Sequence, residues 1–120
     1  MRGNLTCPDK CGFEFNTQFL RDLTELDKLS KIYIKREIYI TSGPRCPEYN
    51  AKVKGINGST HTEGIAADIE FLNSEDLYFL IKHSLGLGIC RIGINREHKY
   101  IHIDKGMKSK RFDKNIIWLY

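Results

Sequence analysis

Four residues of the types that bind metals or move protons lie in two short stretches of the chain: His61, Asp68, His102 and Asp104. His61 and Asp68 bracket a run of small residues in "THTEGIAAD". On a helix they would lie about 10.5 Å apart along the axis, and on a straight strand about 23 Å apart, so neither geometry lets them share one metal ion. To share an ion the chain has to turn back between them, and Gly64 can do so without the steric cost of a Cβ atom.

His102 and Asp104 are two residues apart in "KYIHIDK", where apolar and polar residues alternate. On a strand both side chains would leave the same face, about 7 Å apart. Two imidazoles and a carboxylate form the ligand set of a hydrolytic zinc site with an open fourth position, and such an ion acidifies water and polarises a carbonyl. Any one histidine or aspartate is more often a surface group or a loop cap. The combination favours a metal centre, because the stretch around Asp68 otherwise looks buried and an unpaired buried carboxylate is costly.

The elements that must position these residues follow from the hydrophobic pattern. Apolar residues between 16 and 31 recur at three- and four-residue spacings, which predicts an amphipathic helix capped by Asn16 or Thr17. In chain order the expected elements are this helix (16–31), a strand (36–42), a short helix begun by Pro47 (47–53), a glycine-rich loop (54–59), a strand (64–72), a helix begun by Ser74 (74–85) and two hairpin strands (88–95 and 99–105). This order fits an α+β domain with a central, mostly antiparallel sheet and flanking helices.

Length and composition favour a single domain over residues 1–120. The chain is 41% hydrophobic and 28% charged, which is ordinary for a globular domain large enough to bury a core. The N-terminal "MRGNLTCPDKCG" lacks the apolar core of a secretory signal peptide. We therefore expect the chain to remain in the cytoplasm of the producing cell until it is released.

The formal net charge is +4, from 19 Lys and Arg against 15 Asp and Glu, and the charges are scattered apart from "KGMKSKRFDK" at 105–114. Such a cluster attracts polyanions such as nucleic acid or a cell-wall polymer through long-range forces. A solvated loop is the simpler interpretation. We expect neither nucleic acid nor a membrane as a partner, and we expect a monomer.

The four cysteines do not follow a familiar metal-binding spacing. Cys7 and Cys11 are close in the sequence, whereas Cys46 and Cys90 stand alone, unlike the doubled C-x-x-C of a ribbon-type zinc site. Without a secretory signal, reduced thiols are the default. We therefore do not expect a structural four-cysteine metal site.

Three stretches carry a family resemblance: "TSGPRCPEYNAKV", "GSTHTEGIAADIEF" and "RIGINREHKYIHID". Together they resemble the zinc D-alanyl-D-alanine carboxypeptidases and related murein endopeptidases, including domains of bacteriophage endolysins. The family pattern is SGxR, then SxHxxGxAxD, then HxD or HxH. The resemblance runs from about Leu5 to Asp104, and the middle motif is its most specific part.

The resemblance implies three zinc ligands, His61, Asp68 and His102, and the fold shared with the hedgehog signalling domain. It also implies that Arg45, in "SGPRC", binds a carboxylate of the peptide substrate. A guanidinium suits that role because it offers two parallel donors to a carboxylate. The alternative for Arg45 is a loop arginine that holds the "SGP" turn in place.

The general base is where this sequence departs from the pattern. One branch of the family has a glutamate or aspartate three residues before the final histidine, and Lys99 occupies that position here. The candidates that remain are Asp104 and, with less support, Glu97, His98 and Glu63. Asp104 could serve as a proton shuttle, or it could orient an imidazole from behind.

The last residues, "IIWLY", predict a final strand or a cover over the core; a stacking surface for substrate is the alternative for Trp118 and Tyr120. The function that the resemblance implies is a zinc peptidase that cuts an amide bond in peptidoglycan peptides, as a carboxypeptidase or an endopeptidase. A phage lysis enzyme or virion-associated wall hydrolase suits the small size. The rival is a non-catalytic zinc-containing module of the same fold that binds the wall or another protein.

Overall fold

The computed structural model describes residues 1–9, 11–56, 58–106 and 115–120. Within these ranges, strands form one sheet in the order β1-β2-β3-β5-β4-β6. Their bounds are β1 (Arg2–Gly3), β2 (Tyr39–Ser42), β3 (Ala66–Glu70), β4 (Arg91–Asn95), β5 (Tyr100–Asp104) and β6 (Ile116–Leu119). The short edge strands β1 and β6 pair in parallel with β2 and β4, and the inner pairs are antiparallel. The predicted α+β class with a mostly antiparallel sheet is confirmed.

The helices also lie close to where the sequence predicts them. They are α1 (Thr17–Tyr33), α2 (Pro47–Lys52), α3 (Ser74–Gly86) and a 3₁₀ helix, η1 (Thr60–Glu63). Asn16 caps α1, because its side-chain oxygen accepts from the amides of Gln18 and Phe19. The helix α3 begins at Ser74 as predicted, but its cap is Asn73, which accepts from the amide of Asp76.

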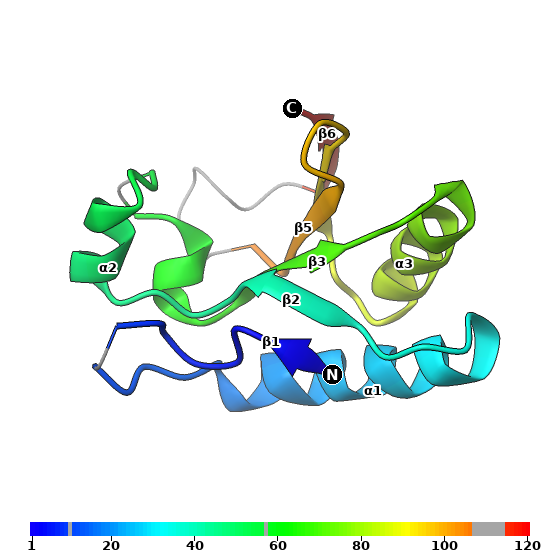
Figure 1. The fold of residues 1–120 in the computed structure, drawn as a ribbon, viewed down its shortest axis with the longest axis horizontal. Helices are drawn as coiled ribbons and strands as arrows, with labels where there is room; N and C mark the ends of the chain where they lie inside the picture. Colours follow the sequence, from blue (N-terminus) through cyan, green and yellow to red (C-terminus); the bar gives the residue numbers. More distant parts are fainter. Residues whose placement is uncertain (10, 57, 107–114) are drawn as a thin grey trace.

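The core lies between one face of the sheet and the helices α1 and α3. Alternate residues of the inner strands point into it, and the helices meet them with their apolar stripes: Ala67, Ile69, Ile101 and Ile103 from the sheet, Phe19, Leu23 and Leu26 from α1, Phe79 and Leu80 from α3. Figure 1 shows α2 at the opposite end of the molecule from α3. Since strand side chains alternate between faces, Asp68, His102 and Asp104 leave the face that the core does not use.

The strands expected over 36–42, 64–72, 88–95 and 99–105 are all shorter in the structure, which has β2, β3, β4 and β5 in these places. The strand expected over 36–42 begins only at Tyr39. Immediately before it, Ile38 donates its amide to the buried carboxylate of Asp27 on α1, at 3.0 Å. The amide of Ile38 therefore binds a helix side chain and does not pair with a neighbouring strand.

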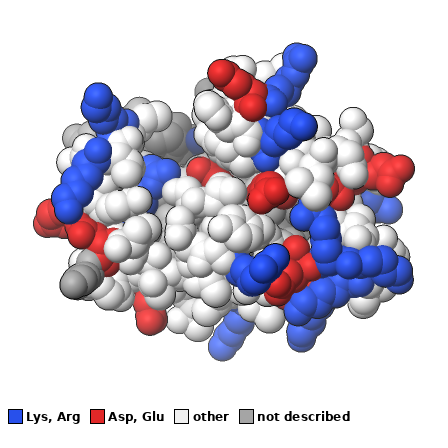
Figure 2. Space-filling model, viewed as in Figure 1, with Lys and Arg blue, Asp and Glu red and all other residues white. Residues whose placement is uncertain are grey.

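Charged side chains of both signs are interspersed around the face shown in Figure 2. Most of the basic segment 105–114 lies outside the described residues; of its first residues, Lys105 forms an ion pair with Asp22 of α1 at 2.5 Å. In the described part of the chain, none of the helices combines the length and the apolar character needed to span a membrane.

Candidate metal centre

The turn between His61 and Asp68 is made by η1 and the glycine that ends it. Ser59 caps η1 and accepts from the amide of His61 at 3.2 Å. Gly64 follows with φ 69°, and a Cβ atom there would lie 2.9 Å from the carbonyl oxygen of Glu14. The chain thus turns back as the spacing predicts, and His61 Nε2 comes within 3.3 Å of Asp68 Oδ1.

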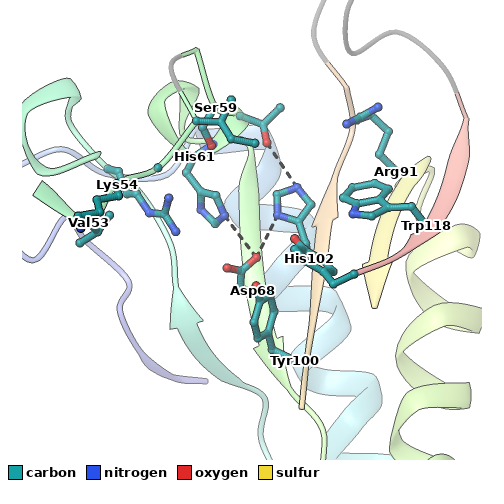
Figure 3. A pocket seen from close by; sticks show the side chains of 14 residues that line it. Val53, Lys54, Ser59, His61, Asp68, Arg91, Tyr100, His102 and Trp118 are labelled. Atoms are coloured by element: carbon teal, nitrogen blue, oxygen red, sulfur yellow. Dashed lines mark hydrogen bonds and ion pairs between the residues drawn. The ribbon is translucent and has the colours of Figure 1, made fainter. Parts of the chain in front are cut away.

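His102 reaches the same carboxylate from the neighbouring strand. Asp68 and His102 are direct partners in the antiparallel register of β3 and β5. His102 Nδ1 lies 3.0 Å from Asp68 Oδ1, so both imidazoles converge on one oxygen, as Figure 3 shows. The three residues are buried, and their ligand atoms all lie within 4.8 Å of one another. The arrangement is a candidate His-Asp-His metal site.

Each imidazole has its outer nitrogen bound by the protein. His61 Nδ1 donates to the carbonyl oxygen of Gly43 at 2.8 Å, and His102 Nε2 donates to Asp104 Oδ2 at 2.6 Å. A carbonyl can only accept, so Nδ1 of His61 carries a proton, and Nε2 is the nitrogen that faces Asp68. Nitrogen and oxygen ligands about 2.0–2.1 Å from a tetrahedral ion are about 3.3 Å apart. The separations of 3.3 and 3.0 Å around Asp68 fit such an ion.

The charges at the site also suit a cation. Burial alone would raise the pKa of the Asp68 carboxyl, but hydrogen bonds from His102 and His61 outweigh it and hold that pKa below its usual range. Burial alone would lower the pKa of His102, but the carboxylates of Asp104 and Asp68 raise it to about 9. The carboxylates of Asp68 and Asp104 thus face the imidazole of His102 from two sides. A divalent ion in place of the proton on His102 Nδ1 would balance the same negative charges.

Asp104 lies behind His102, away from the cavity. It is fully buried. Its Oδ2 accepts from His102 and, at 3.2 Å, from the hydroxyl of Thr60, while its Oδ1 accepts from the amide of Gly106 and pairs with Arg91 Nε at 3.0 Å. With both oxygens held in this way, the geometry favours orientation of His102 over proton shuttling.

A cavity of about 490 Å³ opens in front of the three candidate ligands. Its described lining is cationic and aromatic, with Arg45, Lys54, Arg91, Tyr100, Trp118 and Tyr120 around the candidate ligands. Among the described lining residues Asp68 is the single carboxylate. The cavity therefore suits a substrate that carries a negative charge.

The contacts of Arg45 agree in part with both proposed roles, an anchor of the "SGP" turn and a partner for a substrate carboxylate. Its Nε and Nη2 donate to Ser42 Oγ at 3.1 and 2.8 Å, and its Nη1 donates to Asn50 Oδ1 at 3.2 Å. These bonds hold the "SGP" turn. The side chain also lines the cavity and, within the described ranges, forms no ion pair with a carboxylate. Its charge is available to a ligand in the cavity.

The other candidates for a general base lie elsewhere. Glu97 and His98 are exposed on the turn between β4 and β5, as is Lys99, and Glu63 is exposed on η1. None of them lines the cavity. The structure brings together Arg45, His61, Asp68, His102 and Asp104. It leaves the other three base candidates, Glu63, Glu97 and His98, apart from them.

The sequence did not single out Arg91 as a supporting residue, and it offered Trp118 only as a cover over the core or as a stacking surface. Arg91 lies directly opposite Asp104 in the register of β4 and β5, and its guanidinium lies 5.2 Å from the centroid of the Trp118 ring. Trp118 belongs to β6, as expected, and its ring centroid is 5.5 Å from that of His102. Gly93 makes room for it, because a Cβ atom there would lie 2.5 Å from the indole. A glycine within the alternating "RIGIN" was the available signal of a close approach.

Comparison with protein families agrees with the geometry. A family profile described as Peptidase M15 matches residues 4–104, which include the candidate ligands. The chain belongs to the peptidase M15 family. Membership implies a peptidase with a peptide substrate, and peptidases of this family are typically zinc-dependent. Among curated proteins, none matches the chain significantly.

The contacts of Asp104 generate a prediction about metal affinity. We expect Asp104→Asn to weaken zinc binding about 10- to 100-fold, because a carboxylate behind a ligating imidazole fixes its orientation and raises its basicity. Competitive titration with a chelating dye measures the affinity, and thermal unfolding shows whether the variant is folded. Glu97→Gln, on the exposed hairpin turn, is the matched control and should bind zinc as the wild type does. Unchanged affinity in a folded Asp104→Asn would contradict the orienting role.

Proposed function

We propose that this protein is a zinc-dependent peptidase that hydrolyses an amide bond in peptidoglycan peptides, as a D-Ala-D-Ala carboxypeptidase or a murein endopeptidase. The observation that carries the proposal is the convergence of His61 and His102 on one oxygen of Asp68 beside a cavity. His61 through Nε2, Asp68 through Oδ1 and His102 through Nδ1 would hold the ion. When bound, zinc lowers the pKa of water and polarises the substrate carbonyl.

The chain's own residues hold and orient the reacting groups. Gly43 and Asp104 fix the two imidazoles from behind, through the bonds of 2.8 and 2.6 Å. Arg45, at the cavity wall, pairs with a carboxylate of the peptide and so sets which amide reaches the candidate ligands. Trp118 and Tyr100 give the cavity an aromatic wall against which the peptide packs.

The site of action follows from the substrate. A peptidoglycan peptidase expressed in the cytoplasm of the producing cell reaches the wall after release or as a component of a virion. A phage lysis enzyme fits this description. We propose action as a monomer, with the peptidoglycan peptide as its partner and with neither nucleic acid nor a membrane required.

One observation favours a second candidate function. Lys99 stands where one branch of the family has an acidic base, and the described cavity lining offers no carboxylate besides Asp68. A protein without a base could retain the metal as structure and use the cavity to bind a wall peptide or a protein. An assay that measures both binding and hydrolysis of the same peptide distinguishes the two functions.

Digestion of defined muropeptides tests the proposed activity. The zinc-loaded protein should release an amino acid or separate a cross-linked pair, and mass spectrometry of the products identifies the bond. A chelator should abolish the reaction and added zinc should restore it, while His61→Ala should bring the rate to background because a ligand is lost. Binding of the peptides with full zinc and no cleavage would support the non-catalytic module instead.

Arg45 generates a prediction about substrate recognition. Arg45→Ala should lower kcat/KM about 10- to 100-fold on a substrate with a free carboxylate, since a hydrogen bond to a charged group contributes about 1.5–3 kcal/mol. On the same substrate with that carboxylate amidated, Arg45→Ala and the wild type should turn over alike. Lys52→Ala, on exposed α2 and outside the cavity lining, is the control. A large fall in melting temperature with unchanged turnover would show that Arg45 serves only as an anchor of its loop.

A further inference from the structure

A second group of metal-ligating side chains lies outside the cavity lining. Cys7, Cys11 and Cys46 bring their sulfur atoms within 4.8 Å of one another. Cys7 and Cys46 are buried, and Cys11 is exposed. The sequence spacing gave no sign that Cys46 joins the other two, because 35 positions separate it from Cys11. Cys90 is not part of the group.

Backbone contacts on either side of Cys7 and Cys11 hold the two ends of this segment together. Thr6 pairs with Glu14 as an isolated bridge, and Cys7 donates its amide to the carbonyl of Phe13 at 2.8 Å. Gly12, with φ 72°, directly follows Cys11 and allows the sharp turn there. A short loop that is closed at its base thus supplies two of the three thiols.

Cys46 approaches this loop from the segment before α2. Its amide donates to Cys7 Sγ at 3.4 Å, and the two sulfurs are 3.7 Å apart. Two thiolates that bind one tetrahedral zinc ion at about 2.3 Å are about 3.8 Å apart. A disulfide requires about 2.05 Å and uses two sulfurs, whereas here a third thiol lies beside the pair. The separation and the number of sulfurs both match a shared ion better than a disulfide.

We propose that Cys7, Cys11 and Cys46 bind a second zinc ion, at a structural site distinct from the His-Asp-His centre. Soft thiolate ligands select zinc over the harder divalent ions. In the described part of the chain the cluster offers three ligands, and water would complete the coordination of the ion beside the exposed Cys11. The amide of Cys46 stabilises the negative charge on the Cys7 thiolate.

The position of the cluster gives the second ion a role. Cys46 directly follows Arg45, and the same segment is bonded to His61 through Gly43 O and through the amide of Arg45, which donates to His61 O at 3.1 Å. An ion bound by the three cysteines would connect the N-terminal loop, which carries Cys7 and Cys11, to this segment through Cys46. The segment that carries Arg45 is then held both at the candidate metal centre and at the cysteine cluster.

Cobalt substitution tests the second site in the full-length, reduced protein. Thiolate ligands give Co²⁺ a strong near-ultraviolet charge-transfer band, which nitrogen and carboxylate ligands do not, so the band reports the cysteine site alone. We expect the band in the wild type, in His61→Ala and in Cys90→Ser, the matched control, and we expect its loss in Cys46→Ser. Zinc analysis should find about two ions per chain in the wild type and about one in His61→Ala.

Absence of the band in wild-type protein with free thiols would overturn the proposal, and this result does not depend on how any variant folds. A mass lower by two hydrogens, with the band absent, would overturn it in favour of a disulfide. Persistence of the full band in folded Cys46→Ser would also overturn it. Because the band is read in His61→Ala as well, failure of the peptidase proposal would leave this result intact.

Discussion

The pairing of Asp68 with His102 across β3 and β5 is the constraint on which the candidate site depends. The two residues are direct register partners, so a shift of one residue would move the histidine to the core face. The core prevents such a shift, because Ile69 and Ile101 pair in the same ladder and are fully buried on the other face. The hydrophobic side of the sheet therefore sets the geometry of its polar side.

Burial of the charged groups on the polar face of the sheet is unfavourable, and a network of contacts offsets this cost. Asp68, His102 and Asp104 are all buried, and burying charged groups is unfavourable unless each is paired. Arg91 and Thr60 contact Asp104 from its other sides. The inner edges of His61, Asp68 and His102 face one another, and a cation bound there would complete the charge balance. A cluster with this much buried charge is better explained by function than by stability.

Local patterns predicted much of the fold, because they depend on nearby residues. The three- and four-residue spacing within 16–31 gave α1, and the alternation in "KYIHIDK" placed His102 and Asp104 on one face. The turn at Gly64 followed from the need to bring His61 to Asp68. Residue types and spacing singled out His61, Asp68, His102 and Asp104 as a group, and the family resemblance implied which three of them would be ligands.

The remaining features depend on contacts between distant segments. Arg91 reaches Asp104 only through the register of β4 and β5, and Trp118 reaches His102 only because β6 joins β4 in parallel. The meeting of Cys46 with Cys7 depends on how the N-terminal loop packs against the segment before α2. No periodicity within one element encodes these approaches, which explains why sequence reasoning left Asp104 as a possible proton shuttle and Cys46 as an isolated thiol.

A crystal structure of the zinc-loaded protein, with anomalous differences measured on both sides of the zinc absorption edge, tests the central claim most directly. The geometry predicts an anomalous peak between His61 Nε2, Asp68 Oδ1 and His102 Nδ1, with His102 Nε2 still bonded to Asp104. A saturated crystal with no peak between these three atoms, or with the ion bound by His61 Nδ1 or His102 Nε2, would contradict the account.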